Sequence, residues 1–401
     1  MVQILDTTLR EGEQTPGVYF DNHIKLVIAD LLDELGVDYI EAGHPIVSKD
    51  VYQSVKQIAG RNLNAIIGAH SRSLKKDVDD ALDCGVRFLG LFYCVSDERL
   101  NSVYNKSLDK VKSQIAEIIT YAKAKNPRLI VRYTPEDTVR SEFKNVIEVS
   151  VAAVEAGADI ISIADTTGYM IPGTKRSMYD YVDGLKQELA SRGLYPKIAV
   201  HCHNDRGLAL ANALDGYRAG ADIIDATVLS LGERTGLVDL ATLLTVLKAD
   251  FEVENNWELK KLPELYMLVS RYSNIPIPVN SPIIGENAFT HCAGIHTQAA
   301  LKNPIHYQSL DPTLVGRESR ISLDHMSGMS SVRYALEQIG VQNPDETLLY
   351  QILEQVKTVG KKRTVSLSEL KHIVNGYGKN NGNNGNHDTK GVLVTGRPML
   401  S

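Results

Sequence analysis

Short apolar runs alternate with longer helical patterns over the first 275 residues, and this alternation constrains the fold more than any other feature. Each run has the length of a buried strand, and the segment after it has helical spacing of apolar residues. The expected strands are residues 3–5, 38–41, 65–68, 87–92, 128–133, 159–163, 197–200 and 223–228. Eight such units across about 250 residues predict an α/β fold of the (β/α)8 TIM-barrel type. A doubly wound sheet is the weaker alternative.

The pattern changes after the expected barrel. We expect a TIM-barrel catalytic domain over residues 1–275, followed by a linker subdomain, 276–325, that contributes to the active site. Helical patterns then predict a small, mostly helical C-terminal region, residues 326–376. The last segment, residues 377–401, contains GKNNGNNGNHDTKG. We expect it to be disordered, because so few apolar side chains cannot offset the entropy lost on ordering.

Charge and composition exclude several classes of partner. The formal net charge is -6 and no long run of like charge is present, so nothing indicates nucleic-acid binding. No run approaches the roughly 18 apolar residues of a membrane span, and a charged motif occupies the N-terminus where a signal peptide needs apolar residues. Four cysteines without CxxC spacing fit a reducing compartment. We therefore expect a cytoplasmic protein that binds neither membranes nor nucleic acid.

Ionisable residues gather at the carboxyl ends of the expected strands, where TIM-barrel active sites are built. The first strand leads to Glu11, and the seventh ends at His201 and His203. Because side chains alternate along a strand, both imidazoles can face one ion. With Glu11 as a third ligand, this set suits a divalent Zn, Mn, Co or Mg ion. The alternatives are ordinary structural histidines, and caps formed by Asp6 and Thr7.

Two arginines at the same rim are candidates for substrate contacts. Arg10 can polarise a metal-bound carbonyl, and Arg132 can bind a carboxylate through two parallel hydrogen bonds. For other charged rim residues we favour salt bridges and caps. These are Asp137, Asp165, Glu233 and Arg234.

Three motifs, LDTTLREGEQ, HCHND and LGERTG, resemble the signature of the acetyl-CoA-dependent acyltransferases among the DRE-TIM metallolyases. This family includes isopropylmalate, homocitrate and citramalate synthases. The resemblance implies a condensation of acetyl-CoA with a 2-oxo acid, metal binding by Glu11, His201 and His203, and assistance to the carbonyl by Arg10. Leu237 departs from the isopropylmalate type, in which an asparagine can approach the metal. The resemblance therefore leaves a fourth protein ligand in doubt.

The segment FTHCAGIH, residues 289–296, resembles the family's post-barrel segment, which reaches the active site of the partner subunit. The resemblance implies a homodimer in which His296 removes a proton from the thioester methyl of acetyl-CoA, with Glu136 as a relay. From the sequence alone, His291 and His296 could equally be buried structural histidines.

The residues expected around the substrate side chain resemble those of homocitrate synthases. His70 matches a position at which those enzymes place a histidine and isopropylmalate synthases commonly an apolar residue. Arg132 matches an arginine that holds the distal carboxylate of 2-oxoglutarate, while Thr134 and Thr166 can add hydroxyl donors. Such a site would reject apolar side chains, because a buried arginine would be left unpaired. The alternative is that Arg132 pairs with a neighbouring carboxylate: Glu136, Asp137 or Glu41.

Three other functions are weighed against a homocitrate synthase. The first is a 2-isopropylmalate synthase-like enzyme that takes a hydrophobic 2-oxo acid, such as 2-oxoisovalerate or phenylpyruvate, or a phosphonate analogue. The second is a lyase or aldolase on the same barrel. The third is a barrel that binds a small acid without converting it, which the intact set of ionisable residues disfavours.

Overall fold

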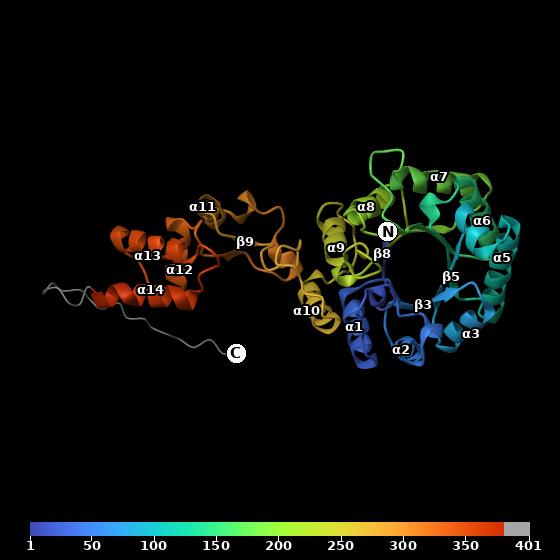
Figure 1. Ribbon diagram of the computed structural model, residues 1–401, viewed down its shortest axis with the longest axis horizontal. Coiled ribbons are helices and arrows are strands. Elements are labelled where there is room, and N and C mark those ends of the chain that lie inside the picture. Colours follow the sequence, from blue (N-terminus) through green and yellow to red (C-terminus); the bar gives the residue numbers. More distant parts are fainter. Residues whose placement is uncertain (381–401) are drawn as a thin grey trace. The chain divides into compact units, whose positions relative to one another are not determined.

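The computed structural model describes residues 1–380 and divides the chain into two compact units (Figure 1). The first unit is Met1–Ile277, and the second begins at Pro278. The boundary lies two residues beyond the one expected from the sequence. A further division at residue 325 stays a prediction.

Eight parallel strands close the first unit into a barrel in which each strand pairs with the next and the eighth returns to the first. The strands are β1 (Gln3–Asp6), β2 (Tyr39–Glu41), β3 (Ile66–Arg72), β4 (Phe88–Cys94), β5 (Ile130–Glu136), β6 (Ile160–Asp165), β7 (Lys197–Cys202) and β8 (Ile223–Ala226). Each overlaps a run predicted from the sequence, so the (β/α)8 prediction is confirmed.

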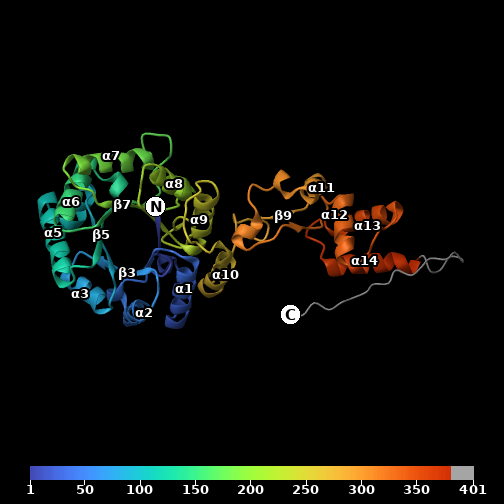
Figure 2. The same cartoon turned by 180° about the vertical axis from the view of Figure 1, so that it is seen from behind.

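Helices surround this barrel, as both ribbon views show (Figure 2). They are α1 (Asn22–Leu35), α2 (Lys49–Ala59), α3 (Lys75–Asp83), α4 (Asp97–Arg99), α5 (Leu108–Lys125), α6 (Phe143–Glu155), α7 (Met178–Ser191), α8 (Ala209–Arg218), α9 (Leu240–Ala249) and α10 (Leu262–Ser273). Among the described residues, no helix is both long and apolar enough to cross a membrane.

Helix α1 shows how local sequence sets these boundaries. The Asp21 side chain accepts a hydrogen bond from the Ile24 backbone N–H at the start of the helix. At the other end Gly36 adopts a left-handed φ of 92°, a conformation that glycine reaches without steric penalty. Between them, Ile28 and Leu32 lie one turn apart and are fully buried.

An apolar layer closes the bottom of the barrel interior. Every strand contributes one side chain to it, and we call it the floor. It consists of Leu5, Tyr39, Phe88, Ile160, Ala199 and Ile223, with Ile66 and Ile130 packed against them. The floor fills the barrel as in other TIM barrels and leaves the carboxyl ends of the strands free to build a site.

The second unit is mostly helical. It contains β9 (Thr290–His291), α11 (Gly294–Lys302), β10 (Arg320–Ile321), α12 (Met329–Gln338), α13 (Glu346–Val359) and α14 (Leu367–Asn380). Its core is made of apolar side chains from the segment 323–370. This arrangement agrees with the helical region expected from the sequence.

The expected start of the disordered tail, residue 377, is wrong, because α14 continues to Asn380. Tyr377 explains the difference. Its ring packs against the core of the second unit, and its hydroxyl donates to the Gln351 carbonyl over 3.3 Å. The rest of that prediction, residues 381–401, lies outside the described residues.

Candidate active site

A polar layer lies directly above the floor of the barrel. Two positions after each floor residue, the next side chain on the same face points into the interior one level higher. The residues at these positions are Thr7, Glu41, Gly68, Gly90, Arg132, Ser162, His201 and Asp225. The two-residue period of the strands thus places six polar side chains and two glycines directly above the apolar floor.

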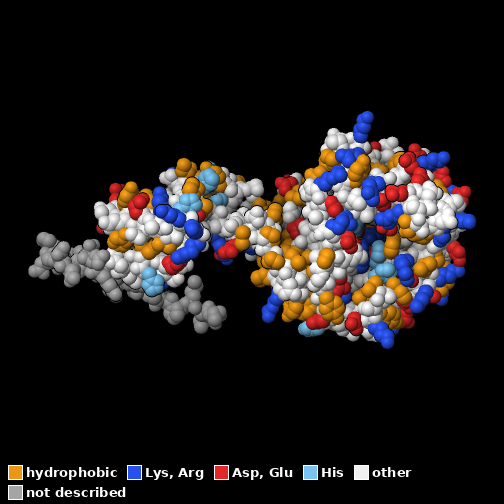
Figure 3. Space-filling view, in the orientation of Figure 1, with side chains coloured by type: hydrophobic (Ala, Val, Ile, Leu, Met, Phe, Trp, Pro, Cys, Tyr) orange, Lys and Arg blue, Asp and Glu red, His pale blue; other side chains and the backbone are white. Residues whose placement is uncertain are grey.

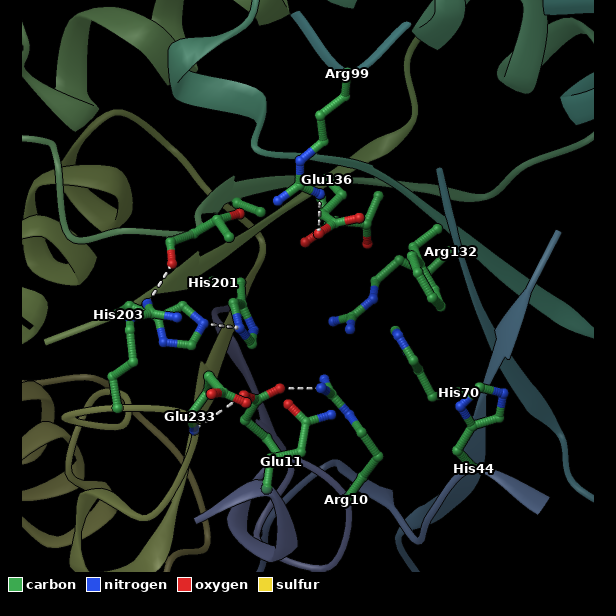
Figure 4. A pocket seen from close by; sticks show the side chains of 17 residues that line it. Arg10, Glu11, His44, His70, Arg99, Arg132, Glu136, His201, His203 and Glu233 are labelled. Atoms are coloured by element: carbon green, nitrogen blue, oxygen red, sulfur yellow. Dashed lines mark hydrogen bonds and ion pairs between the residues drawn. The ribbon is translucent and has the colours of Figure 1, made fainter. Parts of the chain in front are cut away.

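A cavity of about 330 Å³ opens above this layer, and histidine and basic side chains are visible in the hollow of the barrel (Figures 3 and 4). It is lined by Arg10, Glu11, Gln14, His44, His70, Phe92, Arg99, Arg132, Thr134, Glu136, Ser162, Ala164, Thr166, His201, His203, Glu233 and Arg234. Nine of the ten site residues predicted from the sequence are among them. The exception is His296, which lies on α11 in the second unit.

His201 and His203 face each other across a short gap in this cavity. The Nδ1 atom of His201 lies 2.9 Å from Asp225 Oδ2, which leaves Nε2 free, and the two Nε2 atoms are 3.3 Å apart. Two imidazole nitrogens bound to one ion at the usual Zn–N distance would be about 3.0 to 3.4 Å apart. Burial, and then the neighbouring His201, lower the pKa of His203 to about 3, so this ring is neutral and keeps its lone pair.

Glu11, the expected third ligand, is paired with Arg10. Burial opposes its ionisation, but Arg10, His201 and His203 outweigh burial and lower its pKa. Within residues 1–380, no three His, Cys, Asp or Glu side chains converge into a ready-made metal cage. The donor chemistry still fits a divalent ion: two imidazole nitrogens point at one place, and an ionised carboxylate lies close by.

Two buried carboxylates hold the arginines: Glu41, which the sequence analysis named as a possible partner of Arg132, and Asp225, which it did not name. Arg10 donates from Nε to Glu41 over 2.6 Å, and Arg132 donates from Nη1 to both oxygens of Asp225 over 2.9 Å. Arg132 Nη2 also lies 3.6 Å from Glu41. Despite its burial, Glu41 has a pKa well below the usual value because Arg10, His70 and Arg132 surround it.

These contacts differ from the ion pairs that were expected for Arg132. Of the three carboxylates considered as its partners, only Glu41 is near, and the main partner is Asp225. One terminal nitrogen is therefore already committed to Asp225, so two parallel hydrogen bonds to a substrate would have to come from Nε and Nη2, and this role of Arg132 stays a prediction. Its Nε is buried and has no hydrogen-bond partner.

His70 forms a neutral wall of the cavity. Its ring stacks on Phe92 with centroids 4.7 Å apart, and its Nδ1 lies 3.2 Å from Glu41. Burial, and then the positive charge of Arg10, lower the pKa of His70 to about 4. Gly90 makes room for this pair, because an added Cβ would lie 3.0 Å from Glu41 Oε1 and 3.3 Å from His70 Nδ1.

Glu136 receives a hydrogen bond from Arg99 Nη1 over 2.7 Å. Arg99 was missed in the sequence because it lies beyond the strand, where no periodic pattern marks it. The predicted salt bridges and caps are confirmed for three rim residues. Asp137 pairs with Arg140, Arg234 pairs with Asp205, and Asp165 accepts backbone hydrogen bonds from Tyr169 and Met170.

Known families and proteins match most of this chain in sequence. Residues 1–269 match the HMGL-like family, and residues 283–364 match the family described as "Homocitrate synthase post-HMGL domain-like". The homocitrate synthase of Pyrococcus horikoshii is 44% identical over 355 residues, which are 88% of this chain and 94% of that protein. Homocitrate synthase AksA of Methanopyrus kandleri is 40% identical over 93% of this chain and 91% of that protein.

The chain belongs to the homocitrate synthase family. This membership confirms, at the level of the family, the predicted acyltransferase of the homocitrate synthase type. Among solved structures, the HMG-CoA lyase of Bacillus subtilis covers 69% of this chain and 95% of its own, with a TM-score of 0.58 and 22% identity. The hydroxymethylglutaryl-CoA lyase of Pseudomonas aeruginosa covers 72% and 95%, with a TM-score of 0.56 and 21% identity. At such identity these lyases support the barrel fold alone.

Two further expectations concern Leu237 and His296, which are not part of the polar layer. Leu237 is fully buried beside Gly232 and has no atom able to bind a metal. His296 is exposed, and its ring is tilted against that of Tyr307 with ring centroids 4.2 Å apart, so it is not a buried structural histidine. Its role as a base stays a prediction.

Proposed function

We propose that this protein condenses acetyl-CoA with 2-oxoglutarate to give homocitrate and CoA, in the cytoplasm and with a divalent metal. The observation that carries the proposal is the convergence of two imidazole nitrogens and two buried arginines in one cavity of the barrel. Family membership supports the reaction, and the 2-oxoglutarate preference rests on His70 and Arg132. Four free cysteines, three of them buried, support a reducing compartment.

The charges of the cavity support a divalent ion. The arginines that line the cavity contribute four positive charges, and its glutamates together with the buried partners of the arginines contribute five negative ones, which leaves a formal charge of −1. The arginines are Arg10, Arg99, Arg132 and Arg234, and the carboxylates are Glu11, Glu41, Glu136, Asp225 and Glu233. A dicarboxylate carries two negative charges and would be repelled by this centre. A divalent cation reverses the sign of the centre, so the same cavity then attracts the substrate.

Glu11, His201 and His203 would hold the ion, which could be Zn, Mn, Co or Mg. When bound, it supplies a Lewis acid that polarises the 2-oxo group. Arg10, held by Glu41 beside Glu11, is placed to stabilise negative charge that develops on the same oxygen. Because Glu41 fixes Arg10 before the substrate arrives, little reorganisation is needed during the reaction.

The remaining residues orient the two substrates and move the proton. Thr134 and Thr166 line the cavity and can donate hydroxyl hydrogen bonds to carboxylates. We assign the removal of the methyl proton of acetyl-CoA to His296 of the partner subunit in a homodimer. Glu136, whose position Arg99 fixes, would relay the proton.

Release of the CoA thiol with different 2-oxo acids tests this proposal. We expect 2-oxoglutarate to give the highest kcat/KM among 2-oxoglutarate, 2-oxoisovalerate, pyruvate and phenylpyruvate. A higher value for 2-oxoisovalerate or phenylpyruvate would replace the proposal with an isopropylmalate synthase-like function. No CoA release with any acid, at any of the four metals, would reject a condensing enzyme altogether.

Metal dependence needs a separate test. We expect dialysis against a chelator to abolish CoA release, and His203→Ala to reduce kcat/KM by about 1000-fold, since a Lewis acid supplies several kcal/mol. The matched control is His23→Ala, a change on α1 outside the cavity. Full activity of the chelated enzyme would contradict the metal assignment.

A further inference from the structure

The proposed reaction contains a hydrolysis that none of the residues assigned above serves. Condensation joins the methyl carbon of acetyl-CoA to the 2-oxo carbon and leaves the product attached to CoA as a thioester. To give free homocitrate and CoA, water must then cleave that thioester. Water is a weak nucleophile at neutral pH, and a base that takes its proton in the transition state speeds such a step by about 100- to 10000-fold.

His44 lines the cavity near its mouth. The His70 backbone N–H donates to the Gly43 carbonyl over 2.9 Å, so His44 follows one residue nearer the mouth than the level of His70. The two rings meet edge to face with centroids 5.8 Å apart, across the cavity from His201 and His203 (Figure 4). Acetyl-CoA is too large to share a cavity of about 330 Å³ with a 2-oxo acid, so CoA enters through this mouth and the thioester lies above the 2-oxo acid.

A buried carboxylate orients the His44 ring. His44 Nε2 lies 3.5 Å from Asp77 Oδ2, and Arg72 holds Asp77 through two hydrogen bonds of 2.7 and 3.0 Å. Asp77 is 2% exposed, and although burial raises its pKa, Arg72 and His44 outweigh burial and lower it. Because an ionised carboxylate can only accept, Nε2 of His44 carries the proton and Nδ1 carries the lone pair.

The other nitrogen of His44 is free to accept a proton. Nδ1 makes no hydrogen bond with any residue in the described part of the chain. Burial lowers the pKa of His44 despite the neighbouring Asp77, so the ring is neutral at pH 7. A neutral imidazole oriented by a carboxylate is the arrangement with which many hydrolases activate a nucleophile. The contact between such a pair often tightens when a substrate fills the site.

The geometry points to His44 as the general base for hydrolysis of the condensed thioester, with Asp77 as its positioning residue. The Nδ1 lone pair takes one proton from a water molecule while the water oxygen bonds to the thioester carbon. When the carbon–sulfur bond breaks, the imidazolium returns that proton to the leaving sulfur, and the new carboxyl group releases the second proton to solvent. This inference rests on the proposed function and assigns the last step of that reaction.

Single-turnover experiments with the metal-loaded full-length enzyme separate hydrolysis from condensation. Mass spectrometry after an acid quench measures acetyl-CoA and the condensed thioester, and a thiol assay measures free CoA. We expect His44→Gln to slow thiol release by about 100-fold or more, the effect of losing a general base, while acetyl-CoA is consumed at the wild-type rate. The condensed thioester should therefore accumulate in this variant and not in the wild type.

Asp77→Asn tests the positioning role. Asparagine keeps the size of the side chain but no longer fixes the tautomer of His44, so thiol release should slow by about 10- to 100-fold with accumulation of the same thioester. The matched control is Asp80→Asn on the same helix, α3, because the Asp80 side chain makes no hydrogen bond within the described residues. His23→Gln, exposed on α1, is the control for His44. Both controls should behave as the wild type.

The possible results separate this inference from the proposed function. Equal slowing of acetyl-CoA consumption and thiol release in His44→Gln, or thiol release at the wild-type rate, would overturn the role of His44 while leaving a condensing enzyme intact. If His44→Gln does not fold, His44→Asn replaces it, and absence of the condensed thioester in that variant would also overturn the role. A wild-type enzyme that consumes no acetyl-CoA with any 2-oxo acid would instead remove the proposed function itself.

Discussion

The barrel and the second unit bury different kinds of side chain. At the centre of the barrel, five charged residues are no more than 9% exposed: Arg10, Glu11, Glu41, Arg132 and Asp225. The buried side chains of the second unit are apolar or carry a small hydroxyl, such as Ser331, and no charged side chain is buried among its described residues. Both sets of side chains are buried. They differ in what the burial achieves.

Burying an ion opposes folding unless partners compensate for its lost hydration, whereas burying an apolar side chain favours folding. The barrel centre thus contributes little net stability for its size, and its charges are held in place by the surrounding strands. We infer that these charges are kept for chemistry, and that apolar packing makes the main contribution to the stability of the second unit. Substitutions in the two regions should therefore differ in kind.

The largest expected effect is at Asp225. Asp225→Asn removes the charge that compensates Arg132 and the acceptor that orients His201. Leaving a buried charge unpaired costs about 3 to 5 kcal/mol, so the free energy of unfolding in urea should fall by that amount. Asp250→Asn, on the exposed end of α9, should have no measurable effect. Unchanged stability of Asp225→Asn would show that the barrel centre does not depend on charge balance.

A smaller effect is expected in the second unit. Leu349→Ala on α13 opens a cavity in the apolar core and should reduce the stability of this unit by about 3 kcal/mol. Hydrogen exchange can locate the loss, and we expect faster exchange in α12, α13 and α14 but not in β1 to β8. Leu367→Ala is the control, since Leu367 is 47% exposed. Faster exchange across the barrel strands as well would contradict the separation into two units.

The same contrast explains which features could be predicted from the sequence. The strands of the barrel were predictable because buried parallel strands form short apolar runs, and the catalytic rim because ionisable residues follow those runs. Asp225 was missed because it lies inside an apolar run rather than after it, and Glu41, the last residue of its run, was considered only as a partner of Arg132. A signal was available: both occupy the same face as the floor residue two positions earlier, Tyr39 and Ile223.

Other features had no signal of this kind. Arg99 reaches Glu136 from the segment after β4, and nothing in the sequence of that segment indicates the contact. The pairing of β9 with β10 depends on two strands of two residues each, too short for a periodic pattern. The extension of α14 to Asn380 depends on tertiary contacts of Tyr377, which override a polar and glycine-rich local sequence.

The smallest of the expected effects concerns pH and His70. In the folded protein its pKa is lowered to about 4, mainly by burial, whereas an unfolded histidine titrates near 6.5. Between these values the unfolded state binds a proton that the folded state does not, so stability is lost as the pH falls from about 6.5 toward 4. From pH 7 to pH 5 the loss attributable to His70 should be about 2 kcal/mol. His70→Gln, which cannot take up that proton, should show a flatter pH dependence in urea denaturation. The control is His372→Gln, because His372 is exposed on α14 in the second unit and this variant should follow the wild-type curve. If His70→Gln and His372→Gln gave the same pH dependence, the neutral buried imidazole would not distinguish the barrel centre from the second unit.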